Sequence, residues 1–223
     1  MIDCVRNRKI NAALSALYEE YSAAYLTAYI QAFGDVDPPE RINEFGIIDE
    51  ERYDADNGTL FIAKETNGWE NENFQKGYFF REWMNSITKR GLSGHAKKHP
   101  LMWYNIGRWA SLLDNPSHSI PALAEAKSEV IEKIGTVAFT NINKVRGKEQ
   151  AKNEYASLAY HDMSGMLLRE ELSIIQPEMI VCCGTYYEFA YHVKDFNGPV
   201  IAMPHSGARK NTITMLEQLR ASL

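Results

Sequence analysis

Apolar segments of strand length alternate with segments of helix length from residue 136 to residue 221, and this alternation constrains the fold more than any other feature. Near-continuous apolar strands separated by helices are typical of a parallel sheet with both faces covered, because right-handed crossovers carry the chain back over the sheet. An earlier apolar strand joins the same pattern, so we predict an α/β fold with a central four-stranded parallel sheet. The expected strands are residues 59–63, 136–140, 179–183 and 199–202, and the helices that follow the last three are residues 163–175, 185–193 and 208–221.

The chain before residue 136 is expected to be mainly helical. Residues 8–33 carry apolar and aromatic side chains at helical spacing, and Asp37-Pro38-Pro39 ends that helix. No linker-like composition divides the chain, so residues 1–223 are predicted to form a single domain, with a helical extension at residues 1–58 and a core at residues 59–223. Further helices are predicted at residues 77–90, 100–113 and 120–134.

Length and composition narrow the class of protein. A chain of 223 residues with 45% hydrophobic residues can bury the core of one α/β domain. No apolar run is long enough to cross a bilayer, and the first residues lack the charged-then-apolar order of a secretory signal. Cys4, Cys182 and Cys183 lack the spacing of a zinc or iron–sulfur site. We therefore expect a cytoplasmic protein with reduced thiols, no cofactor, no membrane partner and no obligatory protein partner.

Two histidines raise the question of a metal site. His95 and His99 have the i,i+4 spacing of a helical metal-binding pair. Gly94 and Pro100 disfavour a helix around them, because glycine weakens a helix and proline restricts the residue before it. No metal site is predicted.

The distribution of charge matters more than its sum. The formal net charge of -5 does not suggest a nucleic-acid-binding protein, but binding depends on where the charges lie. Residues 89–98 and 141–148 carry cations without an acidic residue, and Arg209-Lys210 form a third cationic group. The first group is interpreted as solvated surface charge. The other two lie beside predicted strand ends, where this interpretation fits less well.

Polar and titratable residues follow the predicted strands at the point where each strand ends. Glu65, Asn141, Gly184 and His205 occupy these positions. The carboxyl ends of parallel strands meet at one edge of a sheet, which is where open α/β folds bind ligands. We expect these four residues to share one crevice, and the carboxylate and the imidazole among them suggest catalysis.

Four segments occur in an order that resembles the uracil-DNA glycosylase superfamily. They are residues 61–68 (FIAKETNG), 139–146 (FTNINKVR), 168–184 (LREELSIIQPEMIVCCG) and 205–209 (HSGAR). The resemblance covers residues 59–215 and does not extend to residues 1–58. It implies a three-layer α/β/α sandwich and an enzyme that flips a nucleotide out of DNA and cuts its N-glycosidic bond.

The resemblance implies that Glu65 and His205 are the catalytic residues. Cleavage of the glycosidic bond leaves positive charge on the sugar and negative charge on the departing base, so the site needs an anion facing C1′ and a hydrogen-bond donor facing the base. Glu65 supplies the anion and His205 the donor. Glu65 can act as a general base or purely by electrostatic stabilisation, and the sequence leaves both roles open.

The same resemblance assigns residues to the flipped base. The amide of Asn141 can donate and accept on one pyrimidine edge, whereas its structural alternative is an ordinary turn residue. Independently of the resemblance, Trp69 lies just downstream of the first segment and offers an aromatic face for stacking, although most aromatic residues of an α/β domain pack in the core. The uracil-specific branch has a tyrosine that excludes 5-substituted pyrimidines, but this chain has Asn67 or Gly68 there, so a larger base is expected to fit.

Residues around the other strand ends are expected to contact DNA. Gly184-Thr185 opens a helix whose free N–H groups could hold a phosphate, although Thr185 could act only as a helix cap. The motif with His205 normally reads His-Pro-Ser, whereas here Pro204 precedes the histidine. The full set of expected DNA-binding residues is Lys144, Arg146, Gly184, Thr185, Ser206 and Arg209.

These features predict a monofunctional DNA glycosylase that removes uracil or a modified pyrimidine, in base-excision repair or in defence against phage with modified DNA. Two alternatives stay open. A catalytically silent member of the same fold would bind DNA with strong salt dependence and leave no abasic sites. An unrelated hydrolase acting on a free nucleoside or another small ligand would turn over without DNA.

Overall fold

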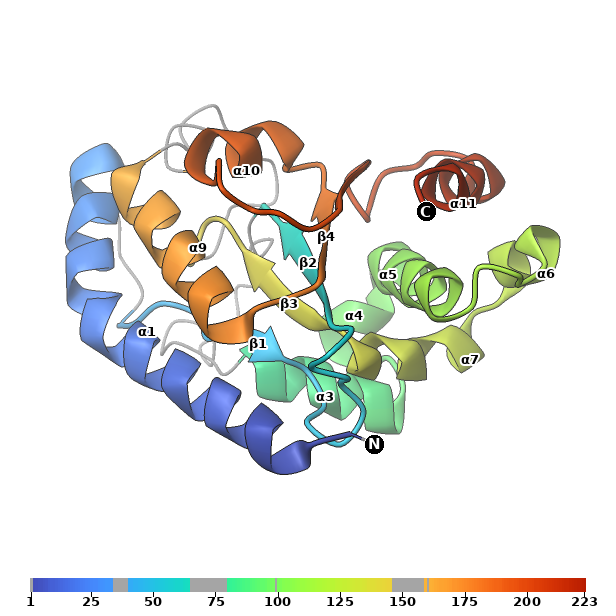
Figure 1. Cartoon of the computed structure of the whole chain (residues 1–223), viewed down its shortest axis with the longest axis horizontal. Coiled ribbons are helices and arrows are strands. Elements are labelled where there is room, and N and C mark those ends of the chain that lie inside the picture. Colours follow the sequence, from blue (N-terminus) through green and yellow to red (C-terminus); the bar gives the residue numbers. More distant parts are fainter. Residues whose placement is uncertain (1, 34–39, 65–79, 99, 146–158, 160) are drawn as a thin grey trace.

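The computed structural model contains a five-stranded sheet with helices on both sides (Figure 1). The structure describes residues 2–33, 40–64, 80–98, 100–145, 159 and 161–223. The strands are β1 (Gly46–Ile47), β2 (Thr59–Ala63), β3 (Ala138–Asn141), β4 (Met179–Cys183) and β5 (Val200–Met203), and their order across the sheet is β1-β3-β2-β4-β5. Strands β3, β2, β4 and β5 are parallel, and β1 pairs with β3 in the antiparallel direction. The α/β class and the parallel arrangement of the four expected strands are confirmed.

The predicted count of four strands is wrong, because β1 adds a fifth. A strand of two residues is too short to show an apolar alternation, so this strand could not be predicted from the sequence pattern. The predicted helix at residues 120–134 is also wrong in detail. The backbone of Ala126 is extended (φ -60°, ψ 140°), and this interruption divides the segment into α6 (Ile120–Glu125), α7 (Ser128–Ile131) and the short 3₁₀ helix η1 (Glu132–Thr136).

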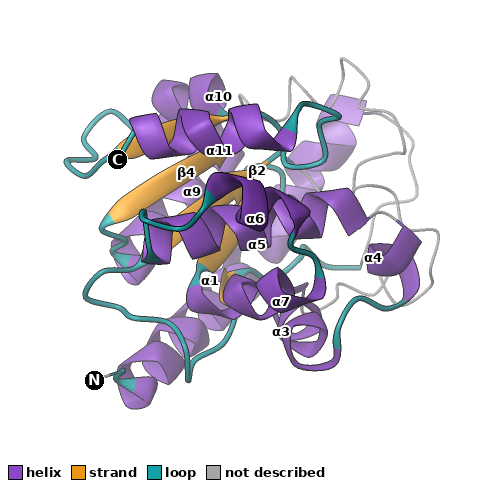
Figure 2. Cartoon of the chain, turned by 90° about the vertical axis from the view of Figure 1, so that its right-hand side faces the viewer, coloured by secondary structure: helices purple, strands orange, loops and turns teal. Residues whose placement is uncertain are grey.

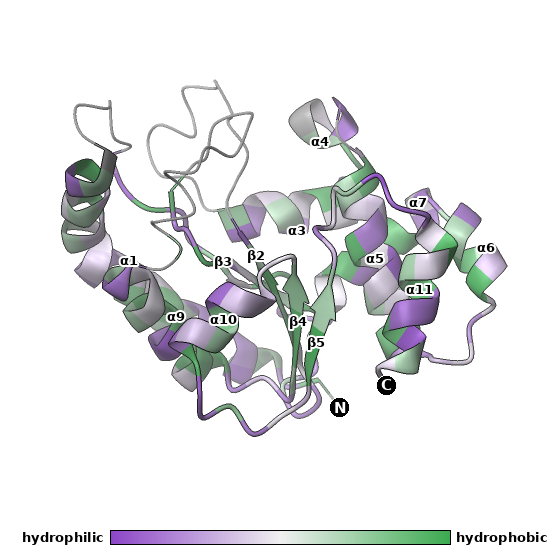
Figure 3. Ribbon diagram, turned by 90° about the horizontal axis from the view of Figure 1, so that it is seen from above, coloured by the Kyte–Doolittle hydropathy of each residue, from purple (hydrophilic) through white to green (hydrophobic). Residues whose placement is uncertain are grey.

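The helices form two groups on opposite sides of the sheet (Figure 3). Helices α1, α9 and α10 lie on one side, and α3, α5, α7 and α11 lie on the other. Figure 2 shows α5, α6 and α11 in front of β2 and β4. None of the described helices is both long enough and apolar enough to span a bilayer. The remaining helix bounds are α1 (Cys4–Phe33), α3 (Phe80–Arg90), α4 (Gly94–Lys98), α5 (Pro100–Asp114), α9 (Asp162–Ile175), α10 (Tyr186–His192) and α11 (Thr212–Ala221).

Helix α4 corrects one expectation. The segment around His95 was predicted to be non-helical, but Gly94 begins a short helix with φ +50°, a conformation that glycine adopts at no steric cost. His99 lies outside the described residues. Within the described part of the chain, no group of three or more histidine, cysteine or acidic side chains is placed to hold a metal ion.

Helix α1 shares the core with the rest of the chain. It packs along α9 and against β1, and its buried residues Leu14, Tyr18 and Tyr25 belong to the same apolar cluster as the strands. The cluster extends from Ile10 to Leu219. Helix α1 therefore contributes directly to the interior that supports the sheet.

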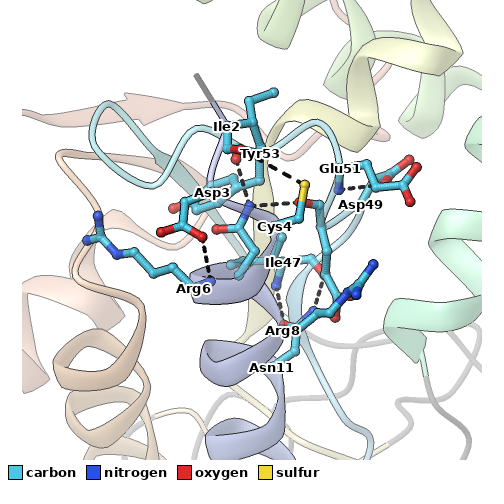
Figure 4. Close-up of polar contacts among 12 residues, drawn as sticks. Ile2, Asp3, Cys4, Arg6, Arg8, Asn11, Ile47, Asp49, Glu51 and Tyr53 are labelled. Carbon is cyan, nitrogen blue, oxygen red and sulfur yellow. Dashed lines mark hydrogen bonds and ion pairs between the residues drawn. The ribbon is translucent and has the colours of Figure 1, made fainter.

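Asn11 on α1 completes the hydrogen bonding of the short edge strand (Figure 4). Its Oδ1 accepts from the backbone N–H of Ile47 at 3.0 Å, and its Nδ2 donates to the carbonyl of the same residue at 3.0 Å. The amide thus makes the pair of bonds that a neighbouring strand would make. Because unpaired edge groups invite pairing with other chains, this contact also protects the edge of the sheet.

Replacing Asn11 with alanine should destabilise the protein. The substitution leaves the buried N–H and C=O of Ile47 without these partners, and an unsatisfied buried polar group costs about 1–3 kcal/mol. Urea unfolding of Asn11→Ala should show a loss of that size in the free energy of unfolding. Lys9→Ala, at an exposed position on the same helix, is the control and should change it little. An equal effect of the two substitutions would contradict the role of the amide.

Candidate functional site

Four loops meet at the carboxyl edge of the parallel strands. Lys64 follows β2, Asn141 ends β3, Gly184 follows β4 and His205 follows β5. In the sheet register Ala63 pairs with Asn141, which places the ends of β2 and β3 side by side. The structure therefore brings Asn141, Gly184 and His205 to one edge, as the sequence pattern predicted.

Hydrogen bonds continue past the ends of the strands and fix the loops to one another. The N–H of Asn143 donates to the carbonyl of Lys64 at 2.9 Å, and the N–H of Gly184 donates to the carbonyl of Met203 at 2.8 Å. Each bond joins residues from neighbouring strands of the sheet. The first residues of these loops therefore have defined positions.

The loop after β4 touches the loop after β5 at Gly184. This glycine has φ +74°, and a Cβ placed on it would lie 3.1 Å from the backbone nitrogen of His205 and 3.2 Å from its Cα. Both the left-handed backbone and the close approach favour glycine. Gly184 consequently sets the position of His205 through backbone contact.

The imidazole of His205 has a defined tautomer. Its Nδ1 accepts a hydrogen bond from the backbone N–H of Gly207 at 3.1 Å. A nitrogen that accepts a hydrogen bond carries no proton, so in the neutral ring the proton is on Nε2. His205 is exposed at the surface, and its Nε2–H is the donor of the ring.

The surroundings of His205 favour this neutral form. Partial removal of water from the ring lowers the pKa of His205, and the positive charge of Lys64 lowers this pKa further. Protonation of Nδ1 would also remove the bond from Gly207. The site therefore presents a neutral donor near pH 7.

Substitution of Lys64 should raise the pKa of His205. Lys64→Gln removes the repulsive charge and leaves the desolvation, so the pKa should move toward the ordinary value of about 6.5 without reaching it. NMR titration of the His205 ring measures this shift, and Lys9→Gln is a charge-matched control on a distant helix. An unchanged midpoint in Lys64→Gln would contradict the electrostatic coupling.

The same shift links pH to stability. The unfolded chain holds a proton on His205 at a higher pH than the folded protein does, so the unfolded state binds more protons in the interval below about pH 6.5. The contribution of His205 to folding stability is therefore full above that pH. It should decrease as the pH falls through the interval between the unfolded and the lowered folded pKa.

Asn141 is buried, and its side-chain oxygen has no hydrogen-bond donor among the described residues. Its side chain is 1% exposed, and within the described part of the chain no group donates a hydrogen bond to its Oδ1. Its backbone carbonyl accepts from Lys144 Nζ at 2.5 Å. Buried polar atoms are nearly always paired, so the unpaired oxygen is an acceptor that a ligand could use.

Lys144 corrects a prediction. The sequence pattern assigned it to DNA, but the residue is 0% exposed, and its Nζ lies 2.5 Å from Oε1 of the equally buried Glu171. A buried ammonium paired in this way has no access to a phosphate. The prediction failed for Lys144 because its side chain turns inward to Glu171.

The three donors of the Lys144 ammonium all have acceptors. These are Glu171 Oε1, Asn141 O and Thr140 Oγ1, the last at 2.8 Å. Glu171 also accepts from the Tyr18 hydroxyl at 2.5 Å and from the Thr140 hydroxyl at 2.9 Å. Burial lowers the pKa of Lys144, and the negative charge of Glu171 opposes that effect. We call these four side chains, Tyr18, Thr140, Lys144 and Glu171, the buried polar network.

Helix α1 also contacts the turn after β3, which contains Lys144, through Tyr25. The Tyr25 hydroxyl accepts from the backbone N–H of Lys144 at 3.0 Å and lies 3.0 Å from Ser164 Oγ on α9. Burial raises the pKa of Tyr25 to about 12, so the hydroxyl keeps its proton. The turn that carries Asn141 is therefore held by both α1 and α9.

Removing one member of the central ion pair should be severely destabilising. Lys144→Met leaves the Glu171 carboxylate buried without a cation, and breaking a buried pair costs about 3–5 kcal/mol. Urea unfolding should show this loss for Lys144→Met and for Glu171→Gln, and the double variant should lose less than their sum. Lys133→Met is the control, since its ion pair with Asp114 is exposed and such pairs contribute at most about 1 kcal/mol. A loss no larger than that of the control would contradict the importance of the pair.

The other predicted DNA contacts differ in their accessibility. Thr185 is buried and donates from Oγ1 to the carbonyl of Ile62 at 2.8 Å, so its hydroxyl does not cap α10, and the capping alternative is wrong. Because the whole residue is buried, it also does not present the free backbone N–H that the predicted phosphate contact requires. Ser206 is also buried, which corrects its assignment as a side-chain contact to DNA. Gly184 and Arg209 are exposed and remain accessible.

Several predicted site residues lie outside the described residues. These are Glu65, Asn67, Trp69 and Arg146. The described part of β2 and its loop ends at Lys64, the residue immediately before Glu65. The expected pairing of Glu65 with His205 therefore stays a prediction.

Glu171 was not predicted as a site residue, although the chain contained a signal for it. Residues 164, 167, 168 and 175 of α9 are buried, and Glu171 falls on the same helical face at the i,i+4 spacing. An acid on an apolar face requires a buried partner, because an unpaired buried charge is prohibitively costly. The sequence does not show which cation pairs with Glu171.

Comparison with known proteins gives no independent assignment. No family model matches the chain, and no curated protein matches it either.

Proposed function

We propose that the protein is a DNA glycosylase that flips uracil or a modified pyrimidine out of DNA and hydrolyses its N-glycosidic bond. The observation that carries the proposal is His205 at the carboxyl edge of the parallel strands, with its Nδ1 occupied by Gly207 and its Nε2–H as donor. A neutral donor in that position suits a leaving group that gains negative charge. The same edge contains Asn141, whose buried Oδ1 can accept from a pyrimidine N–H.

The chemistry of the reaction assigns a role to each of these groups. As the sugar–base bond breaks, electrons move onto the base, and a fixed donor aimed at a base oxygen stabilises that charge in the transition state. His205 supplies the donor, and Lys64 adds positive potential beside it. Glu65, the next residue in the chain, supplies the anion for the sugar in this proposal. Water then adds to C1′, and the products are the free base and an abasic site.

Charge and fold are compatible with DNA as the partner. Arg209 and Lys210 are exposed in the loop that follows His205, and Lys64 is half-buried at the same edge. Helices on both sides of the sheet support a three-layer α/β/α arrangement like that of the uracil-DNA glycosylase superfamily. The proposal places this enzyme in the cytoplasm, in base-excision repair or in defence against phage with modified DNA.

Abasic-site formation is the direct test. The purified protein should convert oligonucleotides with uracil or modified pyrimidines, or modified phage DNA, into products that alkali cleaves at abasic sites. His205→Ala should lower kcat by about 10²–10³-fold, the usual cost of removing one donor to a developing anion. Glu65→Gln should also lower kcat. His118→Ala, at an exposed histidine outside this edge, is the matched control and should keep full activity.

The results distinguish the alternatives. Arg209→Gln should weaken DNA binding and reduce its salt dependence by about one counterion while leaving kcat nearly unchanged. Salt-dependent DNA binding without abasic sites on any substrate would instead identify a silent DNA-binding protein. Turnover of a free nucleoside without DNA would identify a small-molecule hydrolase.

A further inference from the structure

Helix α5 carries two buried polar residues, of which Asn105 contacts the His205 turn and Arg108 contacts Asn105. Asn105 is fully buried and Arg108 is 5% exposed, although they lie on a helix whose buried face is otherwise mostly apolar. Neither was singled out by the sequence pattern. Figure 2 shows α5 beside α11, the helix that follows the His205 loop in the chain.

Arg108 is held by neutral acceptors. Its Nε and Nη2 donate to the carbonyl of Ala126 at 3.1 and 2.7 Å, and its Nη1 donates to Oδ1 of Asn105 at 3.2 Å. The carbonyl of Ala126 lies at the break between α6 and α7. Among the described residues, Arg108 makes no ion pair within 4.0 Å, so its hydrogen bonds fix the guanidinium by geometry.

This geometry determines which way the Asn105 amide points. A guanidinium has donors only, so the amide must turn its oxygen toward Arg108. Its nitrogen then faces the opposite direction and donates to the backbone carbonyl of Ser206 at 2.7 Å. The orientation follows from the chemistry of the neighbours.

Ser206 is the central residue of the turn that fixes the imidazole. The residue before it is His205, and the residue after it is Gly207, whose N–H occupies Nδ1 of the ring. The N–H of Ala208 also donates to the carbonyl of His205 at 2.8 Å. A displacement of the Ser206 carbonyl would therefore move both partners of the bond that sets the tautomer.

We infer that Asn105 is a positioning residue that holds the His205 turn, and that Arg108 sets the orientation of its amide. The inference rests on the proposed function for its catalytic consequence. The placement and tautomer of His205 are properties of the protein without substrate and can be measured separately.

Asn105→Asp tests the inference with a side chain of nearly the same shape. One carboxylate oxygen can keep the contact with Arg108, but the other faces the Ser206 carbonyl, and two acceptors repel each other. The ¹⁵N spectrum of the His205 ring should change from one tautomer, protonated on Nε2, to a mixture. On a substrate that the wild-type protein cleaves, kcat should fall by about 10²-fold, the cost of a misplacement of about 1 Å, with little change in KM.

Two further variants keep the test decisive. Arg108→Lys retains a charge but cannot bridge Ala126 and Asn105 with a planar fork, so it should produce a smaller shift in the same direction. Ser111→Ala is the control on the same helix, because within the described part of the chain the Ser111 hydroxyl bonds only to the carbonyl of Gly107. Thermal melts establish that each variant is folded.

The outcomes separate the inference from the proposed function. A folded Asn105→Asp or Arg108→Lys protein with the wild-type His205 spectrum overturns the inference, whatever its activity. An altered spectrum supports it even when the wild-type protein forms no abasic sites, a result that would reject the proposed function alone.

Discussion

The buried ion pair between Lys144 and Glu171 is the interaction on which the candidate site depends. Its two charges are completely removed from water, which is costly unless every donor and acceptor is paired. The buried polar network meets that requirement, because all three ammonium donors have acceptors and both carboxylate oxygens receive hydrogen bonds. These bonds are directional, so they specify how α1, α9 and the end of β3 fit together in a way that apolar packing alone does not.

This network places Asn141, whereas a different set of contacts places His205. The backbone carbonyl of Asn141 accepts a hydrogen bond from the Lys144 ammonium. The strand register places Asn141 beside Ala63, at the end of β2. His205 is positioned by the close approach of Gly184 in the neighbouring loop and by the hydrogen bond from Asn105 to the carbonyl of Ser206. The two halves of the edge are thus supported from opposite sides of the sheet, the first by α1 and α9 and the second by α5.

The parallel sheet could be predicted well from the sequence, whereas the candidate site could be predicted only in part. The strands β2 and β4 matched their predicted bounds because four consecutive residues of β2 and all five of β4 are apolar, whereas β1 was too short to leave a pattern. The convergence of Asn141, Gly184 and His205 followed from parallel topology. The role of Lys144 did not follow from the topology, because a lysine near a strand end can either contact a ligand at the surface or form a buried ion pair. Only the position of Glu171 on the apolar face of α9 distinguishes these two roles, and its partner becomes known only in three dimensions.

Tyr18 and Tyr25, two of the tyrosines of α1, make the first part of the chain more important than the sequence pattern indicated. The family resemblance begins at residue 59, which would suggest that a protein without residues 1–58 retains the sheet and its carboxyl-edge loops. Tyr18 and Tyr25, however, donate to Glu171 and accept from the Lys144 backbone. Truncation before residue 59 would open the charged centre to solvent and release the turn that bears Asn141. Helix α1 is therefore an integral part of the structure that holds the candidate site. Removing it would remove two of the hydrogen bonds on which the position of Asn141 depends.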